Sequence, residues 1–168
     1  MDKKEAKEPA AYKLMYLDQV YLLTTAHGVT EKEHKPHVIP QLWATPISFK
    51  PQMVAISVAK DRFTHHILEE TKEFVLNIPG SELAPNVWAC APPGGGGDKF
   101  ARSKLTVLKA KKVKAPLIKE CLAAIECKVV DKADAGDHTL FIGDVVATHK
   151  FRSGTVMVNA CGQHEFKV

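Results

Sequence analysis

Short runs of apolar residues alternate with turn-forming residues along most of this chain. Apolar and β-branched residues dominate the short runs, and Gly, Pro, Asn or Asp bound them, which is typical of β-strands. Helical signals are confined to a few short segments. The predicted strands cover residues 20–25, 53–58, 73–78, 123–130, 138–149 and 155–158, and the predicted helices residues 64–72, 81–91 and 98–102. So many strands with so few helices favour a closed or split antiparallel barrel over a doubly wound sheet.

Two features interrupt the strand pattern, a pair of prolines and one glycine. Residues 38–48 read as extended but contain Pro40 and Pro46, and proline is poorly tolerated in a central ladder because it lacks an N–H donor. We therefore expect an interrupted strand at a sheet edge, with free backbone groups facing a ligand. Gly143 breaks the alternation of residues 138–149, which predicts a bulge or a barrel bend there.

Composition limits the class of protein. The chain has 168 residues, of which 45% are apolar and 25% charged, as expected for one globular domain. We expect a flexible tail over residues 1–11 and a single domain over residues 12–168. No apolar run is long enough to cross a bilayer, and the charged N-terminus does not resemble a signal peptide. The four cysteines include no CxxC pair, so free thiols in a cytoplasmic protein are expected.

The positive charge is concentrated in one segment. The net charge is +4, and the densest basic run spans residues 104–119. Such a run can be a nucleic-acid footprint, and a basic nucleic-acid-binding barrel stays open as an alternative. No aromatic stacking residue accompanies these lysines, however, and apolar residues alternate with them. A solvated edge strand protected by lysine is therefore the simpler interpretation, with no nucleic acid and no membrane as partners.

The densest candidate chemistry lies between Trp43 and Thr64. Lys60 and Arg62 precede Thr64, which we expect to cap a helix N-terminus. Cations and a hydroxyl beside the free amides of a helix start make an anion site, most naturally for a phosphate. The alternative is a charged turn between a strand and a helix.

A metal site and a nucleophilic site find less support. His65 and His66 precede Glu69 and Glu70 on a predicted helix, but no third ligand follows at a suitable spacing. A solvent-facing helix surface is the expected interpretation, with no metal. Cys90 has no histidine partner at a recognisable spacing.

Several ordered motifs together resemble one known family. Residues 45–79 (TPISFKPQMVAISVAKDRFTHHILEETKEFVLNIP) are followed by DKF at 98–100, APLI at 115–118, IEC at 125–127, GDHTL at 136–140 and FIGDV at 141–145. This set resembles the flavin reductase-like family of FMN-binding split barrels, which includes flavoredoxins. The resemblance implies a mainly β Greek-key split β-barrel that forms a homodimer and binds one FMN per subunit near the interface.

The resemblance also implies roles for individual residues. The isoalloxazine is expected against Thr45, Pro46, Ile47 and Ser48, and the ribityl chain along Ser57, Val58, Ala59 and Lys60. Arg62 and Thr64, with Lys60, would hold the phosphate, and Lys99 and Phe100 would close over the cofactor. His138 is expected at the open face of the flavin, where the electron donor docks.

Two activities follow from the resemblance. One is an oxidoreductase that passes electrons from NADH or NADPH through bound FMN to free flavin, a ferric chelate or a protein acceptor. The other is a flavoredoxin-type carrier that exchanges electrons with redox proteins and turns over no nicotinamide. The flavin would supply the redox chemistry in both, which agrees with the lack of a nucleophile or a carboxylate pair in the sequence.

Overall fold

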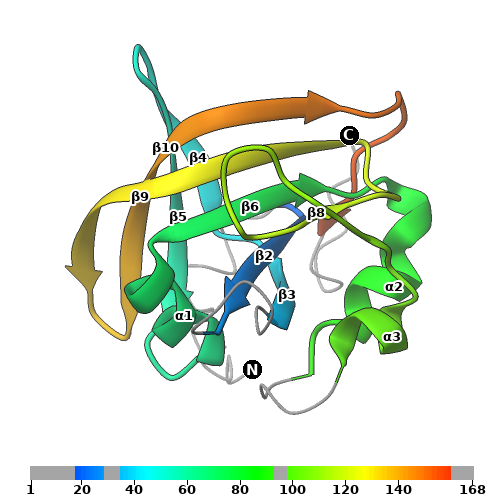
Figure 1. Cartoon of the computed structure of the whole chain (residues 1–168), viewed down its shortest axis with the longest axis horizontal. Coiled ribbons are helices and arrows are strands. Elements are labelled where there is room, and N and C mark those ends of the chain that lie inside the picture. Colours follow the sequence, from blue (N-terminus) through cyan, green and yellow to red (C-terminus); the bar gives the residue numbers. More distant parts are fainter. Residues whose placement is uncertain (1–17, 29–34, 93–97, 160–168) are drawn as a thin grey trace, which may run out of the picture.

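A seven-stranded antiparallel sheet organises the fold (Figure 1). The computed structural model describes residues 18–28, 35–92 and 98–159. The strand order is β3-β2-β6-β9-β10-β5-β4. The strands are β2 (Tyr21–His27), β3 (Lys35–Gln41), β4 (Ala44–Phe49), β5 (Gln52–Ala59), β6 (Glu73–Ile78), β9 (Ala123–Ala135) and β10 (His138–Lys150). The mainly β fold predicted from the sequence is confirmed.

Four two-residue strands lie outside the main sheet. β1 (Asp18–Gln19) pairs with β11 (Val158–Asn159), and β7 (Val107–Leu108) pairs with β8 (Leu117–Ile118). The strand predicted over residues 155–158 is thus reduced to β11 and an isolated bridge from Val156 to Gly80.

The two proline-bearing strands form the two edges of the sheet. β3 contains Pro40 and β4 contains Pro46, and each strand has a neighbour on one side only. The edge position is therefore confirmed, but the prediction of one interrupted strand over residues 38–48 was wrong. The Gln41 side-chain nitrogen donates to the carbonyls of Trp43 (2.8 Å) and Ser57 (3.0 Å). Ser57 belongs to β5, which lies beside the opposite edge strand β4. This contact therefore brings the end of one sheet edge close to the other, and the sheet curls into an incomplete barrel.

The barrel interior follows from the alternation along the strands. Phe74 and Leu76 of β6 point inward and pack with Phe141 of β10 and Ile56 of β5, all of them buried. Val75 points to the opposite face, where it is also fully buried. The sheet is thus covered on both faces at β6, which explains the continuous apolar run in its sequence.

A loop between α3 and β9 supplies the outer cover. Ala110, Val113, Ala115 and Leu117 pack against Val75 and Ala124. The edge strand expected over residues 104–119 was therefore wrong, because only β7 and β8 have strand pairing there. The lysines do face solvent, as expected.

One buried carboxylate fixes this loop to the barrel. Glu126 of β9 is fully buried, and its carboxylate accepts backbone N–H groups from Lys111 (2.9 Å), Lys112 (2.6 Å) and Val113 (3.2 Å). His149 Nε2 lies 2.6 Å from Glu126 Oε1. Burial alone would raise the pKa of Glu126, but the backbone and His149 bonds outweigh it and hold the pKa below its usual range.

Four short helical segments flank the sheet. They are α1 (Phe63–Thr71), a 3₁₀ turn η2 (Ser81–Leu83), α2 (Ala84–Ala89) and α3 (Lys99–Ser103). Asp98 caps α3 through a bond from the Ala101 N–H (3.0 Å). α1 begins at Phe63 with Arg62 at the cap position and no side-chain cap, so the prediction that Thr64 caps this helix was wrong.

The predicted irregularity at Gly143 is confirmed. The β9–β10 register shifts between Ile142 and Gly143. A Cβ atom at Gly143 would lie 2.7 Å from Phe74 Cζ, so only glycine allows this close approach.

The expectations for the cysteines, the N-terminal tail and a membrane span have different outcomes. Cys90, Cys121 and Cys127 are buried free thiols, as predicted, whereas Cys161 lies outside the described residues. The tail expected over residues 1–11 also lies outside them, as does the glycine-rich segment at 93–97. Within the described chain, no helix is both long and apolar enough to cross a membrane.

Candidate functional site

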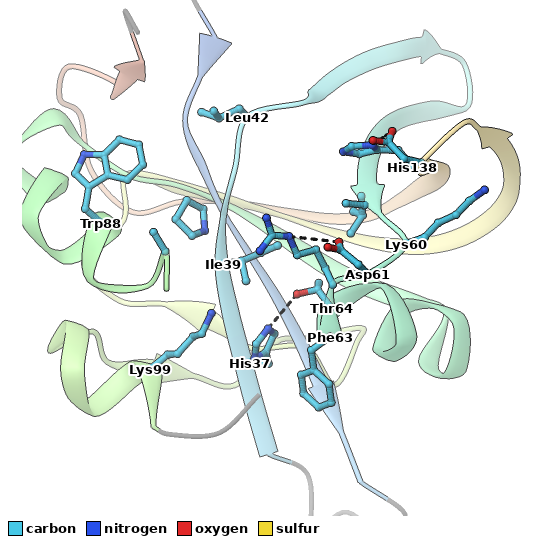
Figure 2. A pocket seen from close by; sticks show the side chains of 16 residues that line it. His37, Ile39, Leu42, Lys60, Asp61, Phe63, Thr64, Trp88, Lys99 and His138 are labelled. Atoms are coloured by element: carbon cyan, nitrogen blue, oxygen red, sulfur yellow. Dashed lines mark hydrogen bonds and ion pairs between the residues drawn. The ribbon is translucent and has the colours of Figure 1, made fainter. Parts of the chain in front are cut away.

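A cavity of about 750 Å³ opens where the barrel is incomplete (Figure 2). Its walls come from β3, the end of β5, the start of α1, α2, α3 and the beginning of β10. The lining residues are His37, Ile39, Pro40, Leu42, Val58, Ala59, Lys60, Asp61, Arg62, Phe63, Thr64, Trp88, Ala91, Lys99, Asp137 and His138. Seven of them (Val58, Ala59, Lys60, Arg62, Thr64, Lys99 and His138) are site residues predicted from the sequence.

Lys99 places a buried positive charge in this cavity. It is 6% exposed, and its ammonium donates to the carbonyl of Cys90 at 3.0 Å. Within residues 18–28, 35–92 and 98–159, it forms no ion pair with a carboxylate. Burial lowers the pKa of Lys99, and the nearby Arg62 acts in the same direction. A buried ammonium without a counterion is costly, so the site favours an anionic ligand.

Arg62 and the start of α1 add further donors. The Arg62 side chain is 53% exposed, and its only ion pair in the described chain is a long one, with Nε 3.7 Å from Asp61 Oδ1. No side chain caps α1, so N–H groups of its first turn are available to a ligand. A guanidinium, an ammonium and a helix N-terminus around one cavity form a suitable cradle for a phosphate.

His37 and Thr64 form the polar floor of the cavity. His37 Nε2 lies 3.0 Å from Thr64 Oγ1, and the side chains are 6% and 1% exposed. Figure 2 shows this bond between β3 and α1. Burial, with help from Lys99, lowers the pKa of His37 to about 4, so the imidazole is neutral at pH 7.

Lys60 does not belong to this group of donors. Its ammonium donates to the carbonyl of Gly136 (2.7 Å) and pairs with Asp134, and Figure 2 shows the side chain extending away from His37 and Thr64. The structure thus gives Lys60, of the predicted triad of Lys60, Arg62 and Thr64, partners at the β9–β10 turn. Lys99 is a further cation that lines the same cavity.

His138 lies at the other end of the cavity from Lys99 (Figure 2). Its Nδ1 is 2.7 Å from Asp137 Oδ1, and its ring contacts Trp43 with centroids 4.8 Å apart. The bond to His138 lowers the pKa of Asp137. His138 is thus an oriented, partly exposed imidazole beside an indole.

The remaining predicted residues have different surroundings. A second, mostly apolar cavity of about 440 Å³ contains Thr45 and Ser57, and it shares Leu42 with the first. Pro46, Ile47 and Ser48 follow along the edge strand β4 and line neither cavity. The Phe100 side chain lies in the apolar core with Val20 and Leu22, so it does not close over the cavity as expected.

Among the lining residues that sequence reasoning did not predict are His37 and Trp88. His37 had no recognisable spacing to another polar residue, although its i, i+2 relation to Ile39 places both on one face of a strand. Trp88, 46% exposed on α2, faces the cavity opposite His138 (Figure 2). Trp88 is the one aromatic residue of α2 (Ala84–Ala89), and this is the sequence feature that could have indicated it.

The histidine and glutamate side chains of α1, weighed above as metal ligands, have other partners in the described chain. His65 pairs with the hydroxyl of Thr139 (2.8 Å), and Glu69 bonds to Lys72 and Lys132. Among the residues that the structure describes, no three His, Cys, Asp or Glu side chains lie where they could hold a metal ion.

Comparison with known proteins identifies the family. Residues 15–162 match the family described as "Flavin reductase like domain". The chain belongs to the flavin reductase-like family. A protein of Archaeoglobus fulgidus without an assigned function is 39% identical over 147 residues, which cover 85% of this chain and 82% of that protein. The reductase component of a 4-nitrophenol monooxygenase from Rhodococcus opacus is 29% identical, with 87% of this chain and 71% of that protein covered.

Solved structures agree with this membership. The NADH:FAD oxidoreductase SgcE6 of Streptomyces globisporus has a TM-score of 0.80 at 21% identity, covering 94% of this chain and 93% of that one. The flavoredoxin of Desulfovibrio vulgaris (Miyazaki F) has a TM-score of 0.73 at 25% identity, covering 89% and 76%. The split-barrel fold expected for this flavin reductase-like protein is therefore confirmed.

Proposed function

We propose that this protein is an oxidoreductase that binds FMN in the cavity of about 750 Å³. The observation that carries the proposal is Lys99, a nearly buried ammonium that faces the cavity with no carboxylate partner in the described chain. A phosphate between Lys99 and Arg62 would supply the missing negative charge. Family membership and an FMN-binding protein of Thermus thermophilus with the same fold (TM-score 0.74, 22% identity) support the choice of ligand.

Different parts of the ligand would bind at the two ends of the cavity. Arg62, Thr64 and Lys99 would bind the phosphate. The ribityl chain would follow the end of β5 at Val58 and Ala59, and the ring system would reach toward Thr45 and Ser57. Bound flavin would supply the hydride and electron transfer, for which this chain has no chemistry of its own.

His138 would act at the exposed end of the site. Its bond to Asp137 and its contact with Trp43 hold the imidazole in one orientation. We propose that it positions the electron donor, with NADH or NADPH as the donor and free flavin, a ferric chelate or a protein as the acceptor. SgcE6 is an NADH:FAD oxidoreductase, which supports a nicotinamide donor. The similar fold of a flavoredoxin supports the second candidate, an electron carrier that takes electrons from a redox protein.

We further propose that the protein is a homodimer. Apolar side chains of β4 and the segment before it are exposed: Trp43 is 41%, Ile47 45% and Phe49 93% exposed. Apolar side chains gathered along an edge strand favour burial against another surface. A second copy of the chain is the partner that we expect.

One set of spectra tests the proposed function. Purified protein is mixed with FMN, desalted and examined between 300 and 550 nm, first alone and then with NADH or NADPH under nitrogen. We expect a bound yellow flavin that NADH or NADPH bleaches. Bound flavin that is bleached only by a reduced redox protein would favour the electron carrier. A colourless protein that binds DNA or RNA with steep salt dependence would contradict both and favour the nucleic-acid-binding barrel.

A further inference from the structure

His37 and Thr64 form a buried pair at the phosphate end of the proposed flavin site. His37 faces the cavity from β3, with Ile39 on the same face, while Val38 points into the core. Thr64 is the second residue of α1 and faces the same cavity. His37 Nε2 lies 3.0 Å from Thr64 Oγ1, so the pair joins a strand and a helix that are separate in the sequence.

The direction of this hydrogen bond decides what the cavity offers to a ligand. A threonine hydroxyl has one hydrogen and two lone pairs. If the hydroxyl donated to His37, only its lone pairs would face the cavity, and they would repel a phosphate oxygen. If His37 Nε2–H donates to Thr64 Oγ1, the hydroxyl hydrogen is free to point at the ligand.

The charges near the pair favour the second arrangement. Lys99 and Arg62 make the cavity attractive to an anion, and an anion requires donors from the surrounding side chains. His37 has a pKa of about 4 because of burial, the positive charge of Lys99 and the neighbouring His27. At neutral pH it therefore carries one ring proton, and the choice of tautomer sets the direction of the bond.

We propose that His37 is a positioning residue: it donates from Nε2 to Thr64 Oγ1 and so directs the hydroxyl hydrogen toward the phosphate of the bound nucleotide. This inference rests on the proposed function, and it adds a specificity role that His37 performs without touching the ligand. The pair would distinguish a phosphorylated flavin from riboflavin, which has the same ring system and ribityl chain but no phosphate.

The test compares FMN with riboflavin in variants of the intact chain. Thr64→Val and His37→Phe each remove one partner, whereas Thr64→Ser and His37→Gln keep a hydroxyl and a side-chain N–H as matched controls. Dissociation constants come from the quenching of flavin fluorescence. The measured quantity is the ratio of the riboflavin constant to the FMN constant.

We expect Thr64→Val and His37→Phe each to lower this ratio by about tenfold, as for the loss of a charge-assisted hydrogen bond. The double variant should lower it no further than Thr64→Val alone, because both changes remove the same interaction. Thr64→Ser and His37→Gln should keep most of the ratio. A purely structural pair would weaken both flavins equally and leave the ratio unchanged, which would overturn the proposal.

A second measurement needs no variant. The ¹⁵N chemical shifts of the His37 ring in the wild-type protein with FMN distinguish the two neutral tautomers. The Nε2–H form is expected, and the Nδ1–H form would overturn the proposal even if every variant failed to fold.

The outcomes also separate this inference from the proposed function. If wild-type protein does not prefer FMN to riboflavin, the phosphate site itself is wrong and the inference falls with it. If Arg62→Ala and Lys99→Met lower the ratio while the His37 and Thr64 variants do not, the phosphate site at Arg62 and Lys99 stands and the roles of His37 and Thr64 are refuted.

Discussion

The imidazole of His138 lies against the indole of Trp43, with ring centroids 4.8 Å apart, while Asp137 holds its Nδ1 at 2.7 Å. Two independent contacts thus fix a side chain that still borders the cavity. A histidine that served only to stabilise the β9–β10 turn would need the Asp137 bond but not the indole. The arrangement therefore suits a residue that must present its ring in one orientation.

The first prediction concerns this histidine. In His138→Ala we expect full FMN content and an unchanged melting temperature, with flavin reduction by NADH or NADPH at least about tenfold slower, a barrier increase of ~1.4 kcal/mol. Stopped-flow absorbance at the flavin band measures the rate. Reduced stability with a normal reduction rate would instead assign His138 a structural role, and loss of FMN alone would place it in direct contact with the cofactor.

The second prediction separates the two lysines near the cavity. Lys99→Met should weaken FMN binding by about 1.5–3 kcal/mol, because it removes a charged donor to the phosphate, and Arg62→Ala should act similarly. Lys60→Met is the matched control, since Lys60 is engaged by Asp134 and Gly136. Titration calorimetry with FMN measures all three. Equal losses for Lys60→Met and Lys99→Met would contradict the assignment of the second cation to Lys99.

The third prediction concerns assembly. Light scattering at micromolar concentration should give the mass of a dimer. The exposed apolar side chains of β4 would lie in its interface, and a stable interface buries at least about 1,000 Å² in total. Ile47→Asp with Phe49→Asp on β4 should shift the protein to a monomer. Val130→Asp, at an exposed apolar position on the distant strand β9, is the control and should leave the dimer intact. A monomeric wild-type protein with bound FMN would refute the proposal.

The fourth prediction concerns Glu126 and pH. Its pKa is depressed in the folded protein, so its contribution to stability is present above the ordinary glutamate pKa and is lost as pH falls through the lower, folded value. Glu126→Ala leaves three backbone N–H groups without their acceptor and should cost about 2–5 kcal/mol at pH 7. Urea unfolding at pH 7 and at pH 3 measures the difference between wild type and variant. The difference should shrink at pH 3, and a constant difference would contradict the linkage.

Local signals in the sequence predicted most of the fold. Turn residues and β-branched runs located the main strands, Pro40 and Pro46 indicated an edge position but not that they belong to two strands at opposite edges, and Gly143 located the bulge. The segment with many lysines was misread because its alternation arises from packing onto Val75 and Ala124, not from strand pairing. An alternating pattern alone does not distinguish such packing from strand pairing.

For the candidate site, too, the sequence showed local patterns but not the contacts between distant segments. The pattern near Arg62 indicated a place for an anion because a cation and a helix start are adjacent in the chain, and the structure puts Arg62 and Thr64 in one cavity. The sequence could not rank Lys60 against Lys99 as the second cation, since proximity in sequence does not show that Lys60 reaches the carbonyl of Gly136. His37 was missed because only the fold brings β3 to the start of α1.

The donors of the proposed phosphate site come from segments that no strand pairing joins. Lys99 belongs to α3 and Thr64 to α1, and Thr64 is bonded in turn to His37 of β3. A ligand bound to them would act as a cross-link between these segments and would raise the free energy of opening each of them. Amide hydrogen exchange should accordingly slow in α1 and α3 when FMN is added, while the paired centre of β9 and β10 keeps its rate. Without ligand, these two helices would open more readily and be cut more easily by a protease than with FMN bound.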